Sequence, residues 1–425
     1  MESNNAIQSS GKALPWAHYR RLPGKPSFEP LQMERGCPNC GASCDDGEGD
    51  VLFELTDFQF YTDWEGVNRA LHRVVRCGEC NLVYTNPRYT AAGFALLFAQ
   101  AGMSYGQSPG RATEQAAWIL KHIPKLKRIA DIGCGDGALL KVFPKTIERF
   151  GADIDERALQ SARANVTGGE FVKTDFTSAI DIPLCDVVTL FHVLEHLPDP
   201  LETLKVLRRQ SGGYTRLIVE VPVLDRAVAE QGQDLVGFFT VQHLTHFTQR
   251  TLHAMLLRAG WRVVESEEIE GYNGYRVVAE SVEAEEAIVD QAAVSEEIKQ
   301  SVAYLGVWLR GIANVDHHLA RLAGHDEVLV WGAGQHTEYM AQVTHLFDAA
   351  KRYVVIDSDP SKQGRTLHGI PVIAPQDVPE AQWRQGSAPI VISTYGGQEE
   401  IRERLLGYGV AETRIVTLYN NVNRY

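Results

Sequence analysis

The chain is 425 residues long, carries a formal net charge of −13 and is 44% hydrophobic. This length predicts two or three globular domains, and the acidic balance disfavours a surface that binds a nucleic-acid backbone. No stretch approaches the ~18 apolar residues of a membrane span, and the first residues lack the pattern of a signal peptide. We therefore expect a cytoplasmic protein that binds neither nucleic acid nor a membrane.

Two pairs of cysteines stand near the N-terminus. Residues 1–30 mix Ser, Asn, Gly and Pro with little periodicity, which predicts a flexible or loosely docked leader. Residues 31–90 then carry two Cys-x-x-Cys pairs separated by 36 residues. Two such pairs place four thiolates around one zinc ion, a ligand set typical of structural sites because it leaves no open coordination position. The predicted zinc ligands are Cys37, Cys40, Cys77 and Cys80.

The segments FELTDFQFYT and LHRVVRC lie between the two pairs and predict a small antiparallel sheet. A catalytic zinc is one alternative, but it would need an open position and usually histidine or carboxylate ligands. Thiol–disulfide chemistry is another, disfavoured because no thioredoxin-like βαβ pattern accompanies the pairs. Cys44 is a spare thiol and an alternative ligand. The favoured interpretation is a zinc-bound β module with a structural or substrate-docking role.

The stretch RIADIGCGDG, residues 128–137, predicts a buried strand that runs into a glycine turn and then a helix. Such a turn lets a ligand approach bare backbone. Candidate cofactor contacts are Asp131, Gly133, Cys134 and Gly135. Helical spacing upstream of this stretch predicts helices that cover the crevice. The alternative interpretation is that this segment is an ordinary strand-to-helix turn, as found in any doubly wound domain, and is not specific to a cofactor.

Three further segments read as strands of the same sheet. GADID ends a second strand at Asp153, 20 residues beyond Gly133, the distance at which a βαβ unit brings a carboxylate to a ribose. VKTDF ends a third strand, and CDVVTLFHVLEHLPDP contains a fourth that leads to His192. The additional candidate cofactor contacts are Asp153, Ile154, Asp175, Phe176 and His192.

The motifs DIGCGDG, GADID, TDF and FHVLEHLPDP resemble, in order and spacing, those of the class I S-adenosylmethionine-dependent methyltransferases, over residues 112–280. This resemblance implies an α/β fold with a Rossmann-like seven-stranded core at residues 91–280, and S-adenosylmethionine as the cofactor. It implies that Asp153 binds the ribose hydroxyls and Asp175 the adenine amine. His192 follows the fourth strand, where open α/β sheets place ligand contacts.

The segment GFFTVQHLTHF carries two histidines on a loop before a predicted helix. It resembles the HEHLxYFS loop of the nucleotide-sugar C-methyltransferases, whose second histidine is the proposed general base and falls on His243. The chain has Thr240 and Gln242 where that loop has tyrosine and glutamate, so carbon, oxygen and nitrogen stay open as methyl acceptors. We predict that His243 is the general base, with His246 and His192 as reserves.

Residues 281–325 are acidic at first and then apolar at helical spacing, which predicts a helical connector. Residues 326–425 repeat the strand, glycine turn and helix pattern and predict a second Rossmann-like domain. Thr337 stands where a dinucleotide-binding motif has its third glycine, so dinucleotide binding is only an alternative. The run IDSDPSKQGRTLHGIPV resembles both the C-terminal domain of sugar C-methyltransferases and the nucleotide-sugar-holding domain of bacterial sugar acyltransferases.

Substrate contacts are predicted in two places. Gly332, Gly334 and His336 belong to the C-terminal glycine turn, which exposes backbone donors at a helix start. Tyr272 and Asn273 belong to YNGYR, which stands where the C-methyltransferases have GGSLR.

The predicted protein is thus a three-part enzyme, a monomer or homodimer, that closes its C-terminal domain over the acceptor. The resemblances imply methyl transfer to a nucleotide-linked keto sugar in polysaccharide or antibiotic biosynthesis. One alternative is an O- or N-methyltransferase of another natural-product or sugar intermediate. An RNA methyltransferase with a zinc docking finger is disfavoured by the acidic charge, and a non-catalytic scaffold gains no support from a chain that keeps Asp153.

Overall fold

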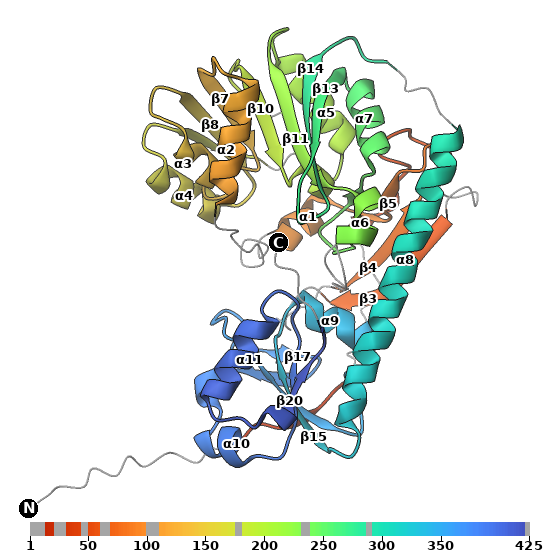
Figure 1. Cartoon of the computed structure of the whole chain (residues 1–425), viewed down its shortest axis with the longest axis vertical. Coiled ribbons are helices and arrows are strands. Elements are labelled where there is room, and N and C mark those ends of the chain that lie inside the picture. The colour runs from red at the N-terminus through yellow and green to blue at the C-terminus, as the bar shows by residue number, and fades with distance from the viewer. Residues whose placement is uncertain are drawn as a thin grey trace, which may run out of the picture.

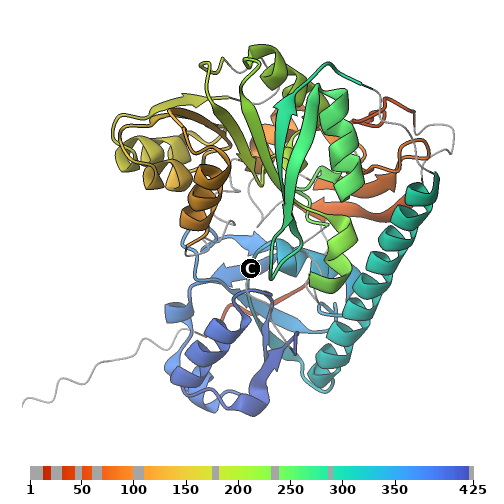
Figure 2. The same cartoon turned by 45° about the horizontal axis from the view of Figure 1, so that its top comes forward.

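The computed structural model describes residues 13–20, 31–43, 50–59, 69–98, 110–174, 181–230, 239–285 and 291–420. These residues form two α/β domains, a small β module and a long helix, α8 (Gln291–Leu319), which runs along one side of the molecule from one α/β domain to the other (Figure 1). A second view shows strands of the β module between the first α/β domain and α8 (Figure 2). The predicted α/β fold class is confirmed.

The first α/β domain, here called the core domain, is built on a seven-stranded sheet in the order β13-β14-β11-β10-β7-β8-β9. Strand β14 runs antiparallel to β11 and β13, and the remaining pairs are parallel. The strands are β7 (Arg128–Ile132), β8 (Glu148–Asp153), β9 (Glu170–Lys173), β10 (Val187–Phe191), β11 (Arg216–Pro222), β13 (Trp261–Glu268) and β14 (Gly274–Ser281). The order reverses between β7 and β10, so their carboxyl ends border a crevice of the kind that binds ligands in open α/β sheets.

Local sequence signals set the helices of the core domain. Pro200 opens one helix directly after the N-cap Asp199, and Thr248 and Thr251 form a capping box at the start of another. The helical elements are α1 (Ala91–Phe98), α2 (Arg111–His122), α3 (Ala138–Val142), α4 (Glu156–Asn165), the 3₁₀ turn η2 (Leu194–His196), α5 (Pro200–Gln210), α6 (Leu224–Glu230) and α7 (Gln249–Arg258). Across the described part of the chain, no helix combines the length and apolar character needed to cross a bilayer.

The β module contains a four-stranded antiparallel sheet in the order β12-β5-β4-β3. Its strands are β3 (Asp50–Gln59), β4 (Arg69–Arg76), β5 (Val83–Thr85) and β12 (Thr245–His246), and β2 (Gln32–Met33) pairs separately with β6 (Arg88–Tyr89). Strand β12 comes from the predicted histidine loop, more than a hundred residues downstream of β5. The module and the core domain therefore share one sheet.

The C-terminal domain has a sheet in the order β17-β18-β16-β15-β19-β20, parallel except at β17. Its strands are β15 (Glu327–Trp331), β16 (Arg352–Ile356), β17 (Thr366–Leu367), β18 (Ile370–Ile373), β19 (Ile390–Ile392) and β20 (Ile415–Thr417). Its helical elements are η3 (Ala320–Leu322), α9 (Gln335–Val343), η4 (Pro375–Asp377), α10 (Glu380–Gln385), α11 (Gln398–Gly407) and η5 (Glu412–Arg414).

Part of the predicted flexible leader is ordered against the C-terminal domain. Strand β1 (Ala17–His18) pairs antiparallel with β16, and the ring of Tyr19 stacks on Phe347 at a centroid distance of 4.9 Å. Residues 13–20 are therefore docked, because backbone pairing and an aromatic contact hold them.

Aromatic side chains from the two α/β domains, the β module and α8 meet around Phe239, which is fully buried. Tyr304 of α8 meets its ring edge-on at 5.0 Å, and Phe53 of β3 lies 5.2 Å from it. Tyr339 of α9 donates a hydrogen bond to the Phe239 carbonyl, and Thr240 donates one to the Gln335 side chain at 3.0 Å. The C-terminal domain is thus anchored to the histidine loop, a few residues before His243.

Candidate functional site

The glycine turn after β7 has the backbone geometry that its sequence predicts. Gly133, Gly135 and Gly137 have φ of 75°, 53° and 78°, a left-handed conformation that costs glycine little. A Cβ on Gly133 would lie 2.2 Å from a methyl of Val193, so this position packs against the turn that follows β10. A Cβ on Gly135 would meet nothing within 4 Å, so the backbone there faces open space. The turn therefore fits a bound ligand at Gly135.

Asp153 lies at the end of β8 beside this turn. Its two carboxylate oxygens accept hydrogen bonds from the backbone nitrogens of Gly135, at 2.8 Å, and Asp155, at 2.9 Å. Burial raises the pKa of Asp153. Each carboxylate oxygen has a second lone pair, so the side chain keeps acceptor capacity for a ribose hydroxyl. Ile154, the next candidate contact, is half-buried.

The other predicted cofactor contacts are placed as follows. Asp131 is buried and accepts a hydrogen bond from Thr189 at 2.6 Å, and burial raises its pKa to about 7. Cys134 is buried, and its sulfur lies 2.7 Å from where a Cβ on Gly151 would stand, which makes it a packing residue. Asp175 and Phe176 lie outside the described residues.

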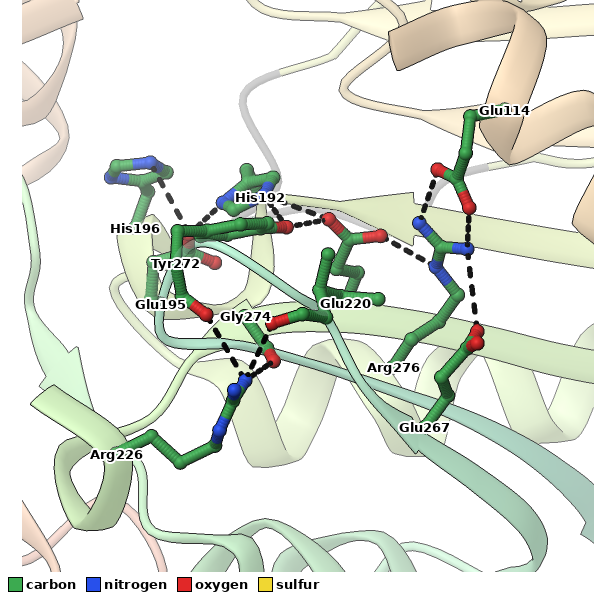
Figure 3. Close-up of polar contacts among 11 residues, drawn as sticks. Glu114, His192, Glu195, His196, Glu220, Arg226, Glu267, Tyr272, Gly274 and Arg276 are labelled. Atoms are coloured by element: carbon green, nitrogen blue, oxygen red, sulfur yellow. Dashed lines mark hydrogen bonds and ion pairs between the residues drawn. The ribbon is translucent and has the colours of Figure 1, made fainter. Parts of the chain in front are cut away.

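His192 follows β10 and is the centre of a polar network (Figure 3). Its φ of 56° is left-handed, an uncommon conformation for a residue with a side chain. The Nε2 atom lies 3.1 Å from Glu220 Oε1 and 3.2 Å from the Tyr272 hydroxyl, and Nδ1 lies 3.5 Å from Glu195 Oε1. The Tyr272 hydroxyl also donates a hydrogen bond to Glu220. The strained backbone thus aims the ring between two carboxylates that are each 1% exposed.

Glu220 continues the network through a buried arginine. Arg276 donates to Glu220 Oε2 from Nε at 2.6 Å, and its other two nitrogens donate to the two oxygens of Glu114 at 2.8 and 2.9 Å. The Arg276 guanidinium also stacks over the ring of Trp118 at 4.9 Å. Glu220 and Arg276 were not identified from the sequence. The sequence does contain a signal for both residues, because each is a charged residue inside an otherwise apolar strand, RLIVEVP or GYRVVAES. A charge buried in such a strand needs a partner.

These contacts set the protonation of the network. Burial alone would lower the pKa of His192, but the carboxylates of Glu195 and Glu220 outweigh it and raise the pKa to about 9. Burial would likewise raise the pKa of Glu220, but hydrogen bonds and charges from His192 and Arg276 hold it well below its usual range. His192 is therefore a cation near neutral pH, between two carboxylates.

The histidine loop lies beside this network, on the other side of Glu195. The His243 and His196 rings lie 4.9 Å apart, and the nitrogen Nδ1 of His196 bonds to the Gln242 carbonyl at 2.8 Å. Thr85 of the β module donates from its hydroxyl to the His243 carbonyl at 3.2 Å and from its nitrogen to the Leu244 carbonyl at 3.0 Å. His243 is half-buried.

His246 has a different environment. It is 1% exposed, pairs through its backbone with β5, and has its pKa lowered well below the usual value by burial. A histidine so enclosed is a poor candidate for contact with an acceptor.

The chain matches two family models, one described as a methyltransferase domain, over residues 108–266, and one described as C2185-like, N-terminal, over residues 324–416. The first match covers β7 to β11, the glycine turn, Asp153, His192 and Glu220. The chain contains a class I S-adenosylmethionine-dependent methyltransferase domain. The predicted resemblance is confirmed at this level.

Curated methyltransferases are similar to part of this chain. A ubiquinone biosynthesis O-methyltransferase from Thiobacillus denitrificans is 33% identical over 109 residues, which are 23% of this chain and 46% of that protein. A trans-aconitate 2-methyltransferase from Rhizobium rhizogenes is 30% identical over 120 residues, 26% of this chain and 45% of that protein. The chain spans less than half the length of these relatives.

A solved structure is also similar to part of this chain. The magnesium protoporphyrin IX methyltransferase from Synechocystis, with bound S-adenosylhomocysteine, is 18% identical and has a TM-score of 0.36. The alignment covers 45% of this chain and 100% of that one.

The four predicted zinc ligands come together in the β module. The sulfurs of Cys37 and Cys80 lie 3.5 Å apart, those of Cys40 and Cys77 lie 3.6 Å apart, and all four ligand atoms lie within 4.8 Å of one another. Zinc–sulfur bonds of ~2.3 Å in a tetrahedron give sulfur separations of roughly 3.8 Å. The donor set and spacing therefore fit one closed zinc site.

The two cysteine knuckles have the same backbone design. In each, the nitrogen of the first cysteine donates to the carbonyl five residues on, and the residue four positions on donates back to that cysteine's carbonyl. This fourth position is left-handed in both, at Gly41 with φ 78° and at Asn81 with φ 59°, residue types that tolerate that conformation. The repeated turn points both pairs of sulfurs at one point.

The predicted substrate residues fall into two environments. Both ring nitrogens of His336 are engaged within the C-terminal domain, with the Ser393 and Tyr419 hydroxyls at 3.1 and 2.6 Å. Burial lowers the pKa of His336 to about 3. A Cβ on Gly332 would lie 2.6 Å from the Ser393 carbonyl, so that glycine permits close packing. These contacts favour a structural role for both residues.

Gly334, Tyr272 and Asn273 are the other predicted substrate residues, and each has different surroundings. A Cβ on Gly334 would lie 3.6 Å from the Lys362 amine, which also lies 3.2 Å from Asp357. Tyr272 belongs to the His192 network, whereas Asn273 is buried and bonds to the Val223 backbone. The structure therefore places Tyr272 in the His192 network, whereas Asn273 has a structural role in the turn.

The cysteine cluster predicts about one zinc ion per chain. The Cys77→Ser variant should hold far less zinc and unfold at a lower temperature, because metal binding contributes folding free energy to the module. Metal analysis and thermal denaturation measure both effects. Cys185→Ala, at a buried cysteine outside the cluster, is the control and should keep its zinc. Active wild-type protein without zinc would contradict the assignment.

The raised pKa of His192 predicts a pH-dependent stability. Its protonated form is favoured in the folded state, so its stabilisation is fully present below pH ~6.5 and is lost as the pH rises through about 9. His192→Asn tolerates the left-handed backbone and removes the cation. Urea unfolding should show the wild type more stable than this variant by about 1–3 kcal/mol at pH 6.5, and by much less at pH 10. A difference independent of pH would refute the assigned protonation.

Proposed function

We propose that this protein transfers the methyl group of S-adenosylmethionine to a small-molecule acceptor bound beside His192, Glu195 and His243. The observation that carries the proposal is the shared edge of the sheet: Gly135 and Asp153 follow β7 and β8, and His192 follows β10 next to them. A cofactor at the first two residues would have its reactive end near the polar network. The names of two curated relatives, which are methyltransferases of ubiquinone biosynthesis and of trans-aconitate, agree with a small acceptor.

The chain has two tasks in this reaction. Bound S-adenosylmethionine supplies a methyl group on a positively charged sulfonium, which is already a good electrophile. The protein must hold the acceptor in line with that methyl group and remove the acceptor's proton. His192 and Tyr272 support the first task, because they hold the carboxylates of Glu195 and Glu220 in place beside the acceptor. Removal of the proton is assigned to the cluster of Glu195, His196 and His243, where His243 is the half-buried member.

We further propose that the acceptor is a nucleotide-linked sugar, held between the methyltransferase domain and the C-terminal domain. Two features support this. The anchoring contacts at Phe239 and Thr240 bring α9 of the C-terminal domain next to the histidine loop. Gly334, at the start of α9, has the Lys362 amine close to its backbone, an arrangement suited to an anionic group. Other small acceptors methylated on oxygen or nitrogen are the alternative.

The His243→Ala variant tests this function. A positioned base typically contributes roughly 10²–10⁴-fold, so turnover should fall by about that factor while affinity for S-adenosylhomocysteine is unchanged. The acceptor is first identified by transfer of labelled methyl groups to a panel of nucleotide-linked keto sugars. Turnover and calorimetry on that acceptor then give the two quantities.

His253→Ala is the matched control, because His253 is a partly buried histidine of the same domain that bonds to Tyr275 away from the cluster. It should keep turnover within a few-fold. Equal turnover in His243→Ala and the control would show that His243 is structural.

A further inference from the structure

Glu195 is a buried carboxylate whose charge is poorly met by its surroundings. It is 1% exposed, and neither oxygen accepts a hydrogen bond from any residue that the structure describes. Its charged neighbour His192, at 3.5 Å, is shared with Glu220. Burying a carboxylate without hydrogen bonds costs several kcal/mol, so such a group needs a strong partner.

The neighbouring histidine points its second ring nitrogen toward the same carboxylate. Nδ1 of His196 donates a hydrogen bond to the Gln242 carbonyl, which fixes the orientation of the ring. In this orientation Nε2 lies 3.8 Å from Glu195 Oε1. A nitrogen and a carboxylate oxygen, both of which are common metal-ligand atoms, thus lie close together.

His243 completes a set of three donors. One ligand atom each from Glu195, His196 and His243 lies within 4.8 Å of the others. Bonds of ~2.1 Å to one ion would place such atoms roughly 3–3.5 Å apart. The three side chains would therefore have to move only slightly closer together to bind an ion. The carbonyl that fixes His196 belongs to Gln242, beside His243, and this is the outer-shell contact that orients metal-bound imidazoles.

We infer that Glu195, His196 and His243 bind a divalent first-row transition-metal ion, distinct from the cysteine-bound zinc. Two imidazoles and one carboxylate suit such ions, and three protein ligands leave positions open for an acceptor. This inference rests on the proposed function and deepens it: the acceptor offers the ion an oxygen, either a hydroxyl or the carbonyl beside the reacting carbon. The ion lowers the pKa of the bound acceptor, whose proton passes to water. His243 then contributes to the removal of the proton as a ligand of the ion and not as the base itself.

The test measures Mn²⁺ binding to the full-length protein with its cysteine-bound zinc retained. Mn²⁺ prefers nitrogen and oxygen donors to thiolates, so the cysteine cluster does not compete. Electron paramagnetic resonance titration should show about one bound Mn²⁺ per wild-type chain, and a thermal shift should accompany it. The affinity should fall at least ~10-fold in Glu195→Gln and remain unchanged in His253→Asn.

The stability of Glu195→Gln is a second readout, which shows whether this variant fails to bind Mn²⁺ only because it is unfolded. Without added metal, Glu195→Gln should be at least as stable as the wild type, because it removes a buried charge. Wild type that binds no Mn²⁺, or Glu195→Gln that binds it equally well, overturns the inference. Full turnover in the presence of a chelator that removes Mn²⁺ also overturns it. None of these results decides the proposed function, which the kinetics of His243→Ala test separately.

Discussion

The backbone pairing of β5 with β12 places the histidine loop, and much of the site depends on it. Cys77 and Cys80 immediately precede β5, Thr85 at its end bonds to the carbonyls of His243 and Leu244, and the Leu244 nitrogen bonds to the Glu195 carbonyl. A continuous set of contacts therefore runs from the cysteine cluster to the polar residues beside the crevice. A module that looks separate in sequence is a support for the methyltransferase domain.

Charge balance is the second constraint. Glu220 is almost completely buried, and the structure meets its charge with His192 and Arg276. Glu114 of α2 and Tyr272 of the turn before β14 then complete the contacts of that arginine and of Glu220. Fully satisfied polar networks of this kind hold side chains in one arrangement. This rigidity suits a site that must keep an acceptor in line with a methyl group.

Much of this architecture follows from local sequence. The glycine turn, the acid of β8 and the two cysteine knuckles were predicted because each needs particular residue types at fixed spacing. Periodicity likewise predicted the strands and the long helix α8. The seven-stranded order agrees with the fold that the motifs imply.

Contacts between distant segments were not predictable in the same way. The pairing of Thr85 with His243, and of Arg276 with Glu114, joins residues 158 and 162 positions apart. The burial of the Glu195 carboxylate without hydrogen bonds from the described residues likewise cannot be predicted from the sequence. His336 was predicted to contact substrate, but Ser393 and Tyr419, far along the chain, occupy both of its nitrogens.

The central claim is that S-adenosylmethionine binds at the carboxyl ends of β7 and β8, with Asp153 at the ribose. Calorimetric titration of S-adenosylhomocysteine tests it most directly, with wild type compared to Asp153→Ala and to Glu148→Ala at the opposite end of β8. Loss of a charge-assisted hydrogen bond of ~1.5–3 kcal/mol predicts a dissociation constant roughly tenfold to a hundredfold higher for Asp153→Ala and unchanged for Glu148→Ala. Equal affinity in all three proteins would contradict the account.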